Sequence, residues 1–135
     1  MNYKVTIKKI DWLDEEAREA EVCFELGDTL FWAFSYPCPF IEGEKKNVHI
    51  SFIMDDDIDF DIVFSGNKDK EIKIVNSERS KESYYCYGKV VSINPVIADC
   101  GDMLFNLGDL THDVRVVGEY VYFVIERLDI CYAPM

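Results

Sequence analysis

Short runs of branched and aromatic residues, separated by glycine or proline, fill the last third of the chain and limit what it can fold into. Val, Ile, Tyr and Phe dominate these runs between Tyr84 and Ile130. Such side chains suit a pleated, half-buried surface, and glycine permits tight connections and bulges. We therefore expect four or five consecutive strands that curl into part of a barrel or a tightly bent sheet. The separators are Gly88, Pro95, Gly101, Gly108 and Gly118.

The first half of the chain shows the two-residue alternation of half-buried strands. It is clear over residues 3–10, 20–26 and 48–54, and Gly27-Asp28 predicts a hairpin turn. Residues 29–35 are apolar on both faces, which predicts a strand that is central or covered on both sides, and residues 71–75 predict a further strand. A short helix competes with a strand only over residues 11–19, where Asp14 would be a suitable N-terminal cap. The prolines in the segment 36–40 lack the N–H groups of a ladder, which predicts an extended, rigid loop there.

These patterns predict a mainly β protein with about ten short strands. The strands would form a single-domain antiparallel barrel or two packed, strongly bent sheets, with at most one or two short helices. The 135 residues suffice for a hydrophobic core without disulfide or metal staples. The polar loop 76–83 is the only plausible internal boundary. Because a division there would leave two incomplete sheets, we expect one domain over residues 1–135.

One segment resembles a known architecture. The runs Gly88–Ile93, Ala98–Gly101 and Val117–Phe123 look like strands of an OB-fold-like small β-barrel, so the resemblance covers residues 88–123 only. That fold commonly binds oligonucleotides or oligosaccharides across one sheet face. The resemblance implies a fold and hardly an activity, because Lys89, Arg115 and Arg127 are the only basic residues after residue 83.

The net charge of −12 is spread over the whole chain, so it belongs to the folded surface. Nucleic-acid binding is unlikely on this ground, because an acidic surface repels a polyanion. The acidic surface could attract a basic protein partner, or it could simply keep the protein soluble.

The densest acidic cluster lies in the segment 55–64. Alternation over residues 57–64 predicts a strand that turns its apolar side chains one way and its carboxylates the other. A calcium-binding loop is a poor match, since the required glycine and glutamate positions are not filled. A solvated, edge-protecting face and a protein-docking surface remain as interpretations. The candidate partner-binding residues are Asp55, Asp56, Asp57, Asp59 and Asp61.

No catalytic motif, cofactor motif or metal site is found in the sequence. His49 and His112 have no serine or cysteine at a motif spacing, so a structural or surface role is the simpler interpretation. Cys100 lies between Asp99 and Asp102. Because neighbouring negative charges oppose thiolate formation, Cys100 is a poor candidate for a nucleophile.

Three aromatic residues are candidates for ligand contact. Tyr36 and Phe40 flank the proline-rich loop, and Trp32 precedes it. Stacking rings on a stiff loop can line a ligand groove. Core packing is the alternative for the rings of residues 31–34.

Five widely spaced cysteines fit neither a metal site nor a disulfide framework. The first residues alternate like a strand, no signal-peptide core is present, and no run reaches the length of a membrane helix. We therefore expect a cytoplasmic protein with reduced thiols and no membrane association.

Two functions stay open at this point. The first is a non-enzymatic acidic protein-interaction module, of the immunity, inhibitor or adaptor type, that docks a basic partner. The alternative is a small-ligand or oligosaccharide-binding β-barrel that uses its aromatic residues. An enzyme is not expected.

Overall fold

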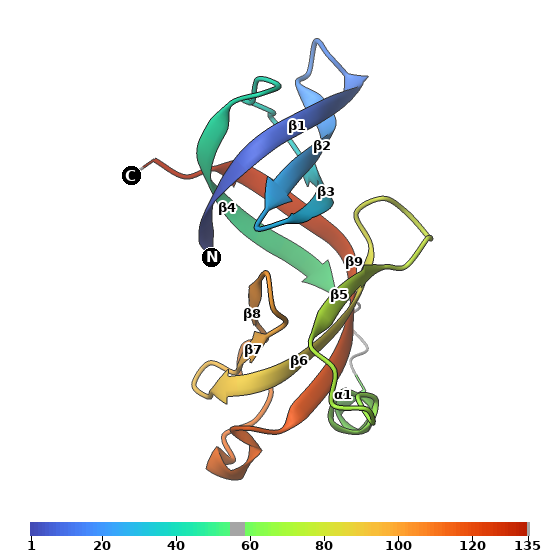
Figure 1. The fold of residues 1–135 in the computed structure, drawn as a ribbon, viewed down its shortest axis with the longest axis vertical. Helices are drawn as coiled ribbons and strands as arrows, with labels where there is room; N and C mark the ends of the chain where they lie inside the picture. Colours follow the sequence, from blue (N-terminus) through green and yellow to red (C-terminus); the bar gives the residue numbers. More distant parts are fainter. Residues whose placement is uncertain (55–58, 135) are drawn as a thin grey trace. The chain divides into compact units, whose positions relative to one another are not determined.

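A computed structural model of the protein describes residues 1–54 and 59–134. It is mainly β, with 54% strand and 7% helix, which confirms the predicted fold class (Figure 1). The strands are β1 (Asn2–Asp14), β2 (Glu19–Leu26), β3 (Thr29–Ser35), β4 (Lys45–Met54), β5 (Lys73–Asn76), β6 (Tyr84–Ser92), β7 (Ile97–Asp99), β8 (Leu104–Asn106) and β9 (Tyr120–Tyr132). The helices are α1 (Phe60–Ser65) and a 3-10 turn, η1 (Val114–Val116).

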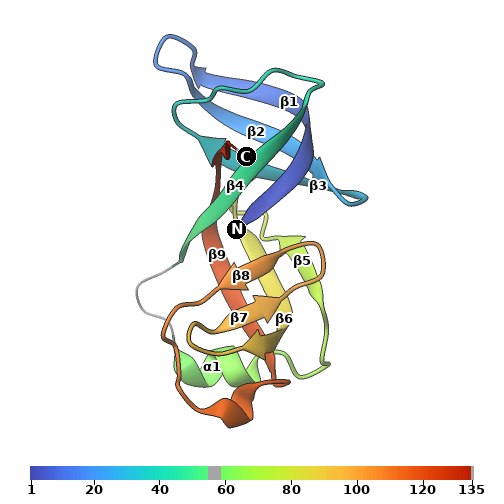
Figure 2. The same ribbon diagram turned by 90° about the vertical axis from the view of Figure 1, so that its left-hand side faces the viewer.

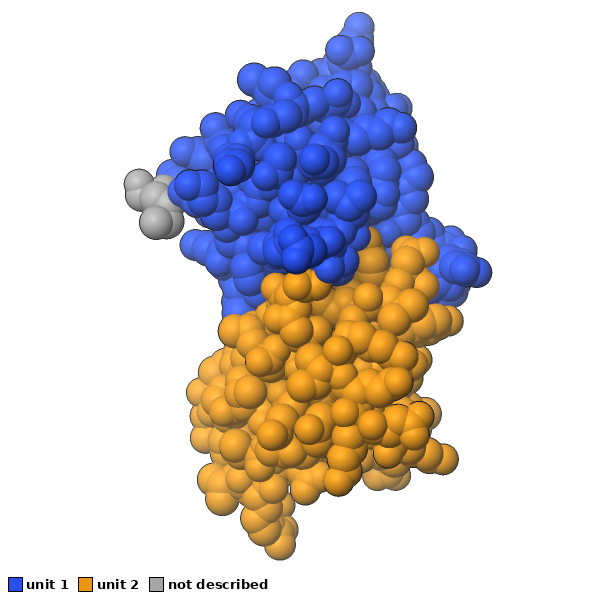
Figure 3. Space-filling view, viewed as in Figure 1, with its two compact units in different colours: residues 1–53, 77–83, 126–135 blue, residues 54–76, 84–125 orange. Residues whose placement is uncertain are grey.

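The described chain falls into two compact units (Figure 3). Unit 1 contains residues 1–53, 77–83 and 126–135, and unit 2 contains residues 54–76 and 84–125. The chain therefore crosses between units at both ends of the polar loop that the sequence marks as a boundary. The single-domain organisation stays a prediction.

Unit 1 is a small closed five-stranded barrel (Figure 2). The strand order is β3-β2-β1-β4-β9, and β9 returns to pair with β3. That last pairing is parallel and places Phe34 opposite Asp129. A barrel of this kind is compatible with an OB-like fold.

The barrel core follows directly from the alternation in the sequence. On β2 and β3, every second side chain points inward, and the ring centroids of Phe24 and Phe31 lie 5.8 Å apart on paired positions. The intervening hairpin needs a left-handed residue, which Gly27 supplies with a φ of 61°. The fully buried barrel residues include Ile7, Val22, Phe24, Phe31, Val48 and Leu128.

The stretch 11–19, where a helix competed with a strand, is the end of β1 and a turn. Asp14 does act locally, but its Oδ1 accepts the Ala17 N–H at 3.2 Å in the turn between β1 and β2. A helix does not form because β1 pairs with β2 through to Asp14 and Glu19, which leaves only a short turn between the two strands.

Unit 2 is built on β6. One edge of β6 pairs with β9, and the other pairs with β5 near its start and with β7 near its end. β8 then pairs with β7. The OB-like resemblance was assigned to residues 88–123, which lie in this unit, whereas the closed barrel is made by residues of unit 1. The sequence pattern predicts the short strands of this unit. It does not predict which strands close a barrel, because closure depends on pairings between segments far apart in the sequence.

The predicted strand over residues 57–64 is wrong for its described part, because residues 60–65 form α1. Asp59 caps this helix: its Oδ1 accepts the N–H groups of Asp61 at 3.0 Å and Ile62 at 3.4 Å. This cap satisfies backbone donors at the start of the helix. Asp59 and Asp61 therefore do not lie on one face of a strand, as the alternation had predicted.

The buried amide of Asn67 holds the connection after α1 in place. Its Nδ2 donates to the carbonyl oxygens of Glu71 at 2.9 Å and Val121 at 3.0 Å. Its Oδ1 accepts the Glu71 N–H at 2.8 Å. One side chain thus replaces several missing backbone partners in unit 2.

We predict that Asn67→Ala lowers the free energy of unfolding by about 1–3 kcal/mol, because it leaves buried backbone groups without partners. Urea unfolding followed by circular dichroism measures the change. The matched control is Lys68→Ala, an exposed neighbour whose loss should cost less than about 0.5 kcal/mol. Equal stability of the two variants would contradict the role of Asn67.

Candidate functional site

Helix α1 carries the described end of the acidic segment and two exposed apolar side chains. Phe60 is 46% exposed and Ile62 is 51% exposed, while Val63 is the residue that α1 buries. The rings of Phe60 and Phe64 lie 4.8 Å apart. We call Asp59, Phe60, Asp61 and Ile62 the α1 surface.

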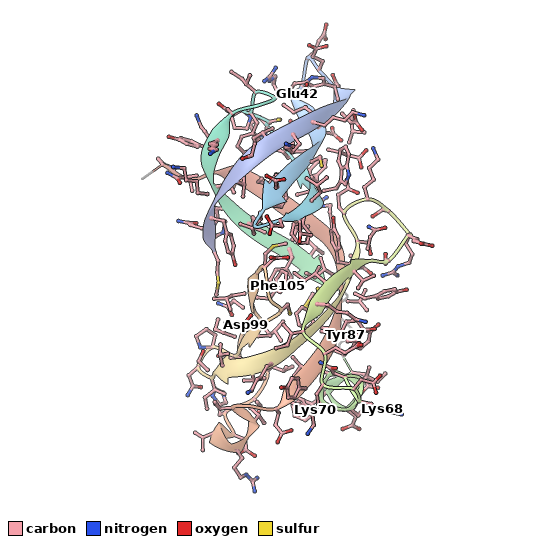
Figure 4. All side chains as sticks on the ribbon, viewed as in Figure 1. Glu42, Lys68, Lys70, Tyr87, Asp99 and Phe105 are labelled. Carbon is pink, nitrogen blue, oxygen red and sulfur yellow. The ribbon has the colours of Figure 1, made fainter. Side chains whose placement is uncertain are left out.

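The carboxylates of the α1 surface have no cationic partner among the described residues, although that of Asp59 caps the helix. Within the described residues, neither Asp59 nor Asp61 takes part in an ion pair. Figure 4 shows Lys68 and Lys70 beside α1, in the connection that follows it. The start of α1 thus carries acidic side chains, while the connection after its end carries both signs, with Asp69 between the two lysines. The other three predicted partner-binding residues, Asp55, Asp56 and Asp57, lie outside the described residues.

The aromatic candidates are separated by the fold. Phe40 is 1% exposed and belongs to the core, so its proposed role in ligand contact is wrong. The segment folds inward because the Cys38 N–H donates to the Arg18 carbonyl at 2.6 Å, which ties the proline-rich loop to the turn after β1. Tyr36, in contrast, is 62% exposed, and Trp32 is half-buried.

Two half-buried rings, Trp32 and Phe34, lie on β3, and the exposed Tyr36 directly follows the strand. Trp32, Phe34 and Tyr36 alternate with the buried residues Phe31, Ala33 and Ser35. We call this set the β3 row. The sequence singled out Trp32 and Tyr36 but assigned Phe34 to the core. It was missed because both sides of the strand are apolar, and apolarity alone does not tell inside from outside.

Cations lie over two rings of the β3 row. The Lys81 Nζ is 4.2 Å from the Trp32 ring centroid, and the Arg127 guanidinium carbon is 4.4 Å from that of Phe34. Each cation also pairs with a carboxylate: Lys81 with Asp11 at 2.7 Å and Arg127 with Asp129 at 2.7 Å. These side chains come from segments far apart in the sequence, so no local motif could have revealed them.

A second aromatic cluster lies on the sheet of unit 2. The ring centroids of Tyr87 and Tyr122 are 5.0 Å apart, and the Lys73 Nζ is 4.8 Å from the Tyr87 centroid. Lys73 also pairs with Glu71 at 2.8 Å. Because Lys73 is already paired with a carboxylate, we interpret the cluster as cross-strand packing and not as an anion-binding site.

The nucleophile and acid–base candidates have structural environments. Burial, aided by the charge of Asp99, raises the pKa of the Cys100 thiol to about 12, and burial also raises the pKa of Cys86. His49 Nδ1 lies 2.9 Å from the Asn2 Oδ1, and His112 Nδ1 lies 2.6 Å from the Asn94 Oδ1. Neither imidazole is brought to a cysteine or serine by these contacts.

Two further features concern the part of the chain that the structure describes. No three His, Cys, Asp or Glu side chains gather there in a way that could hold a metal ion. No helix in this part is long and apolar enough to cross a membrane.

Comparison of the chain with family models, with curated proteins and with solved structures finds no match.

We predict that only one of the five thiols reacts rapidly with an aromatic disulfide reagent at pH 8. Cys131 is exposed and the other four cysteines are buried. Stopped-flow absorbance should show one fast equivalent, with the rest appearing only after unfolding in denaturant. Cys131→Ser should remove the fast phase and Cys100→Ser should leave it intact. A fast phase lost with Cys100 would instead indicate an activated thiol.

Proposed function

We propose that this protein is a non-enzymatic interaction module that docks a basic partner protein. The support begins with charge. Unit 1 holds fourteen acidic and nine basic residues, and unit 2 holds twelve acidic and five basic residues. Both units are therefore acidic. The excess of acidic over basic residues is larger in unit 2, although unit 2 has fewer charged residues than unit 1.

The observation that carries the proposal is the composition of the α1 surface. Two large apolar side chains, Phe60 and Ile62, are about half exposed and alternate with Asp59 and Asp61. Apolar anchors supply affinity in a protein interface, while flanking charges steer the encounter and select the partner. A partner that presents basic side chains around an apolar pocket would complement this surface.

The alternative explanation, that the acids only keep the protein soluble, does not account for the apolar residues. Solubility is served by carboxylates alone, and exposed phenylalanine works against it. The absence of ion pairs at Asp59 and Asp61 within the described residues also leaves both charges available to a partner. Five free cysteines are consistent with a location in the cytoplasm, which is part of the proposal.

A second candidate function is supported by the β3 row. We infer that the barrel is OB-fold-like, and in that fold the face of the second and third strands is used for ligand binding. Trp32, Phe34 and Tyr36 lie along this face and could stack against the rings of an oligosaccharide. This candidate ranks second because Lys81 and Arg127 already lie over two of the three rings.

The docking proposal predicts salt-sensitive binding that depends on α1. The protein is used as bait in an extract of its source cells, and a recovered protein is purified and titrated. The partner should be basic, and its affinity should fall at least about tenfold between about 50 mM and about 500 mM salt.

The variant Asp59→Asn/Asp61→Asn tests the assigned surface. Asparagine keeps the helix cap while the two charges are lost, so α1 should stay folded and affinity should fall about five- to tenfold. The matched control is Glu15→Gln/Glu16→Gln, which removes two exposed charges from the turn after β1. A partner that is not basic, or equal losses in both double variants, would refute docking through α1.

The second candidate makes a separate prediction. In a Trp12→Phe background, Trp32 is the only tryptophan, and its fluorescence reports on the β3 row. Titration with soluble glucan, xylan and chitin oligosaccharides should change the emission, and Tyr36→Ala should weaken that binding by about 1 kcal/mol or more. Unchanged emission with all of these oligosaccharides would refute the proposal of oligosaccharide binding.

A further inference from the structure

Strand β5 forms an edge of the sheet in unit 2. Among the strands that the structure describes, it pairs with β6 alone, from Lys73 opposite Tyr87 to Asn76 opposite Tyr84. Figure 2 shows β5 at the outer side of this sheet, beside β6. A sheet edge presents backbone N–H and C=O groups that can pair with a further strand.

The contacts of Asn67 show which residues of this edge turn their backbone outward. The Glu71 N–H donates to the Asn67 Oδ1 at 2.8 Å, and the Glu71 carbonyl accepts from the Asn67 Nδ2 at 2.9 Å. The same Nδ2 lies 3.4 Å from the carbonyl oxygen of Gly88 on β6, so the backbone of Glu71 faces β6. Because successive residues of a strand direct their N–H and C=O groups to opposite sides, those of Ile72 and Ile74 face away from β6.

The edge is apolar and its lysine does not block it. Ile72 is 48% exposed and Val75 is 42% exposed. An outward lysine commonly protects an edge strand from pairing. The Lys73 Nζ is instead 2.8 Å from the Glu71 Oε2 and 4.8 Å from the centroid of the Tyr87 ring, so it is held over the sheet of its own unit.

The charge around this edge differs from that of the rest of unit 2. Residues 68–76 hold three of the five basic residues of unit 2 and only two of its twelve acidic residues. A basic segment would therefore find no acidic excess here to attract it. A second copy of this chain, although it carries a net charge of −12, meets no local acidic excess at this edge.

We propose that the β5 edge pairs with the β5 edge of a second copy, antiparallel and about a two-fold axis at Ile72. In this register Glu71 of each copy lies opposite Lys73 of the other. Opposite charges placed directly across a strand pair stabilise it, and like charges destabilise it. An axis at Lys73 would place the two Lys73 side chains opposite each other, which excludes that register.

The pairing uses the groups that the single copy leaves outward. The N–H and C=O of Ile72 bond to those of Ile72 in the second copy, and the two exposed side chains pack on the same face of the joined sheets. The ladder is short, because Lys70 has a φ of 53° and leaves the extended conformation. The interface is therefore small, and we expect association in the range of about 10 µM to about 1 mM.

This inference does not rest on the proposed function, because it uses neither the α1 surface nor the β3 row. Its tests need only the purified protein, so failure of one proposal leaves the other to be judged by its own experiment.

Sedimentation equilibrium tests the dimer between about 10 µM and about 1 mM protein. The molar mass should rise with concentration toward twice that of one chain. Ile72→Pro removes the central N–H but leaves the bonds between Glu71 and Asn67 in place, and proline is tolerated where the N–H of an edge strand faces outward. Dimer affinity should fall at least about tenfold. The matched control Ile72→Val keeps the N–H and should keep the dimer, and circular dichroism verifies that both variants are folded.

A charge exchange tests the pairing of Glu71 with Lys73 across the axis. Lys73→Glu places four carboxylates around the axis and should weaken the dimer at least about tenfold. Glu71→Lys/Lys73→Glu has the net charge of the original chain and restores the alternation of charges, so its affinity should return to within about threefold. A dimer that persists in both Ile72→Pro and Lys73→Glu would overturn the proposal.

Cross-linking tests the register in a Cys131→Ser background, which lacks the exposed thiol. Ile72→Cys should form a disulfide between copies on mild oxidation, because residues directly opposite in an antiparallel pair have Cα atoms about 5.5 Å apart, which suits a disulfide. Ile74→Cys, two residues from the axis, should cross-link much more slowly. A protein that stays monomeric at every concentration, or faster cross-linking through Ile74→Cys, would overturn pairing about Ile72.

Discussion

The barrel of unit 1 depends on one parallel pairing, that of β3 with β9. Without it, the strands from β3 through β4 to β9 would form an open sheet with two exposed edges. The pairing joins Phe34 to Asp129, positions separated by most of the chain, so loop-closure entropy opposes it. What offsets this cost is the burial of apolar side chains such as Phe24, Phe31 and Leu128 inside the closed barrel.

Closure of the barrel also explains how the charge is distributed on its surface. It brings Arg127 of β9 over the ring of Phe34, and the polar loop 76–83 brings Lys81 over Trp32. Asp11 and Asp129 on this face are therefore each paired with a cation of the same unit. The α1 surface has no such internal match among the described residues, which makes it the better candidate for an external basic partner.

Two failures of sequence interpretation, besides that at Phe34, concern segments whose pattern supports two structures. In the segment 57–64, alternating apolar residues favour a strand, but Asp59 caps a helix of which only Val63 is buried. At Phe40, neighbouring prolines correctly indicated a loop, but a backbone hydrogen bond from Cys38 to Arg18 turns that loop into the core. A local side-chain cap decides the first case and a hydrogen bond between distant residues decides the second, and periodicity reports neither.

The sequence by itself determined the mainly β class, most of the strands of the first half, the hairpin at Gly27 and the acidic character of the surface. These follow from side-chain alternation, backbone preferences and charge, which are local properties. Only the tertiary structure decided which strands close the barrel, that Phe34 faces outward, and that Lys81 lies over the ring of Trp32. Those contacts join segments tens of residues apart, and they form because burial and hydrogen bonding are satisfied over the whole fold and not along the chain.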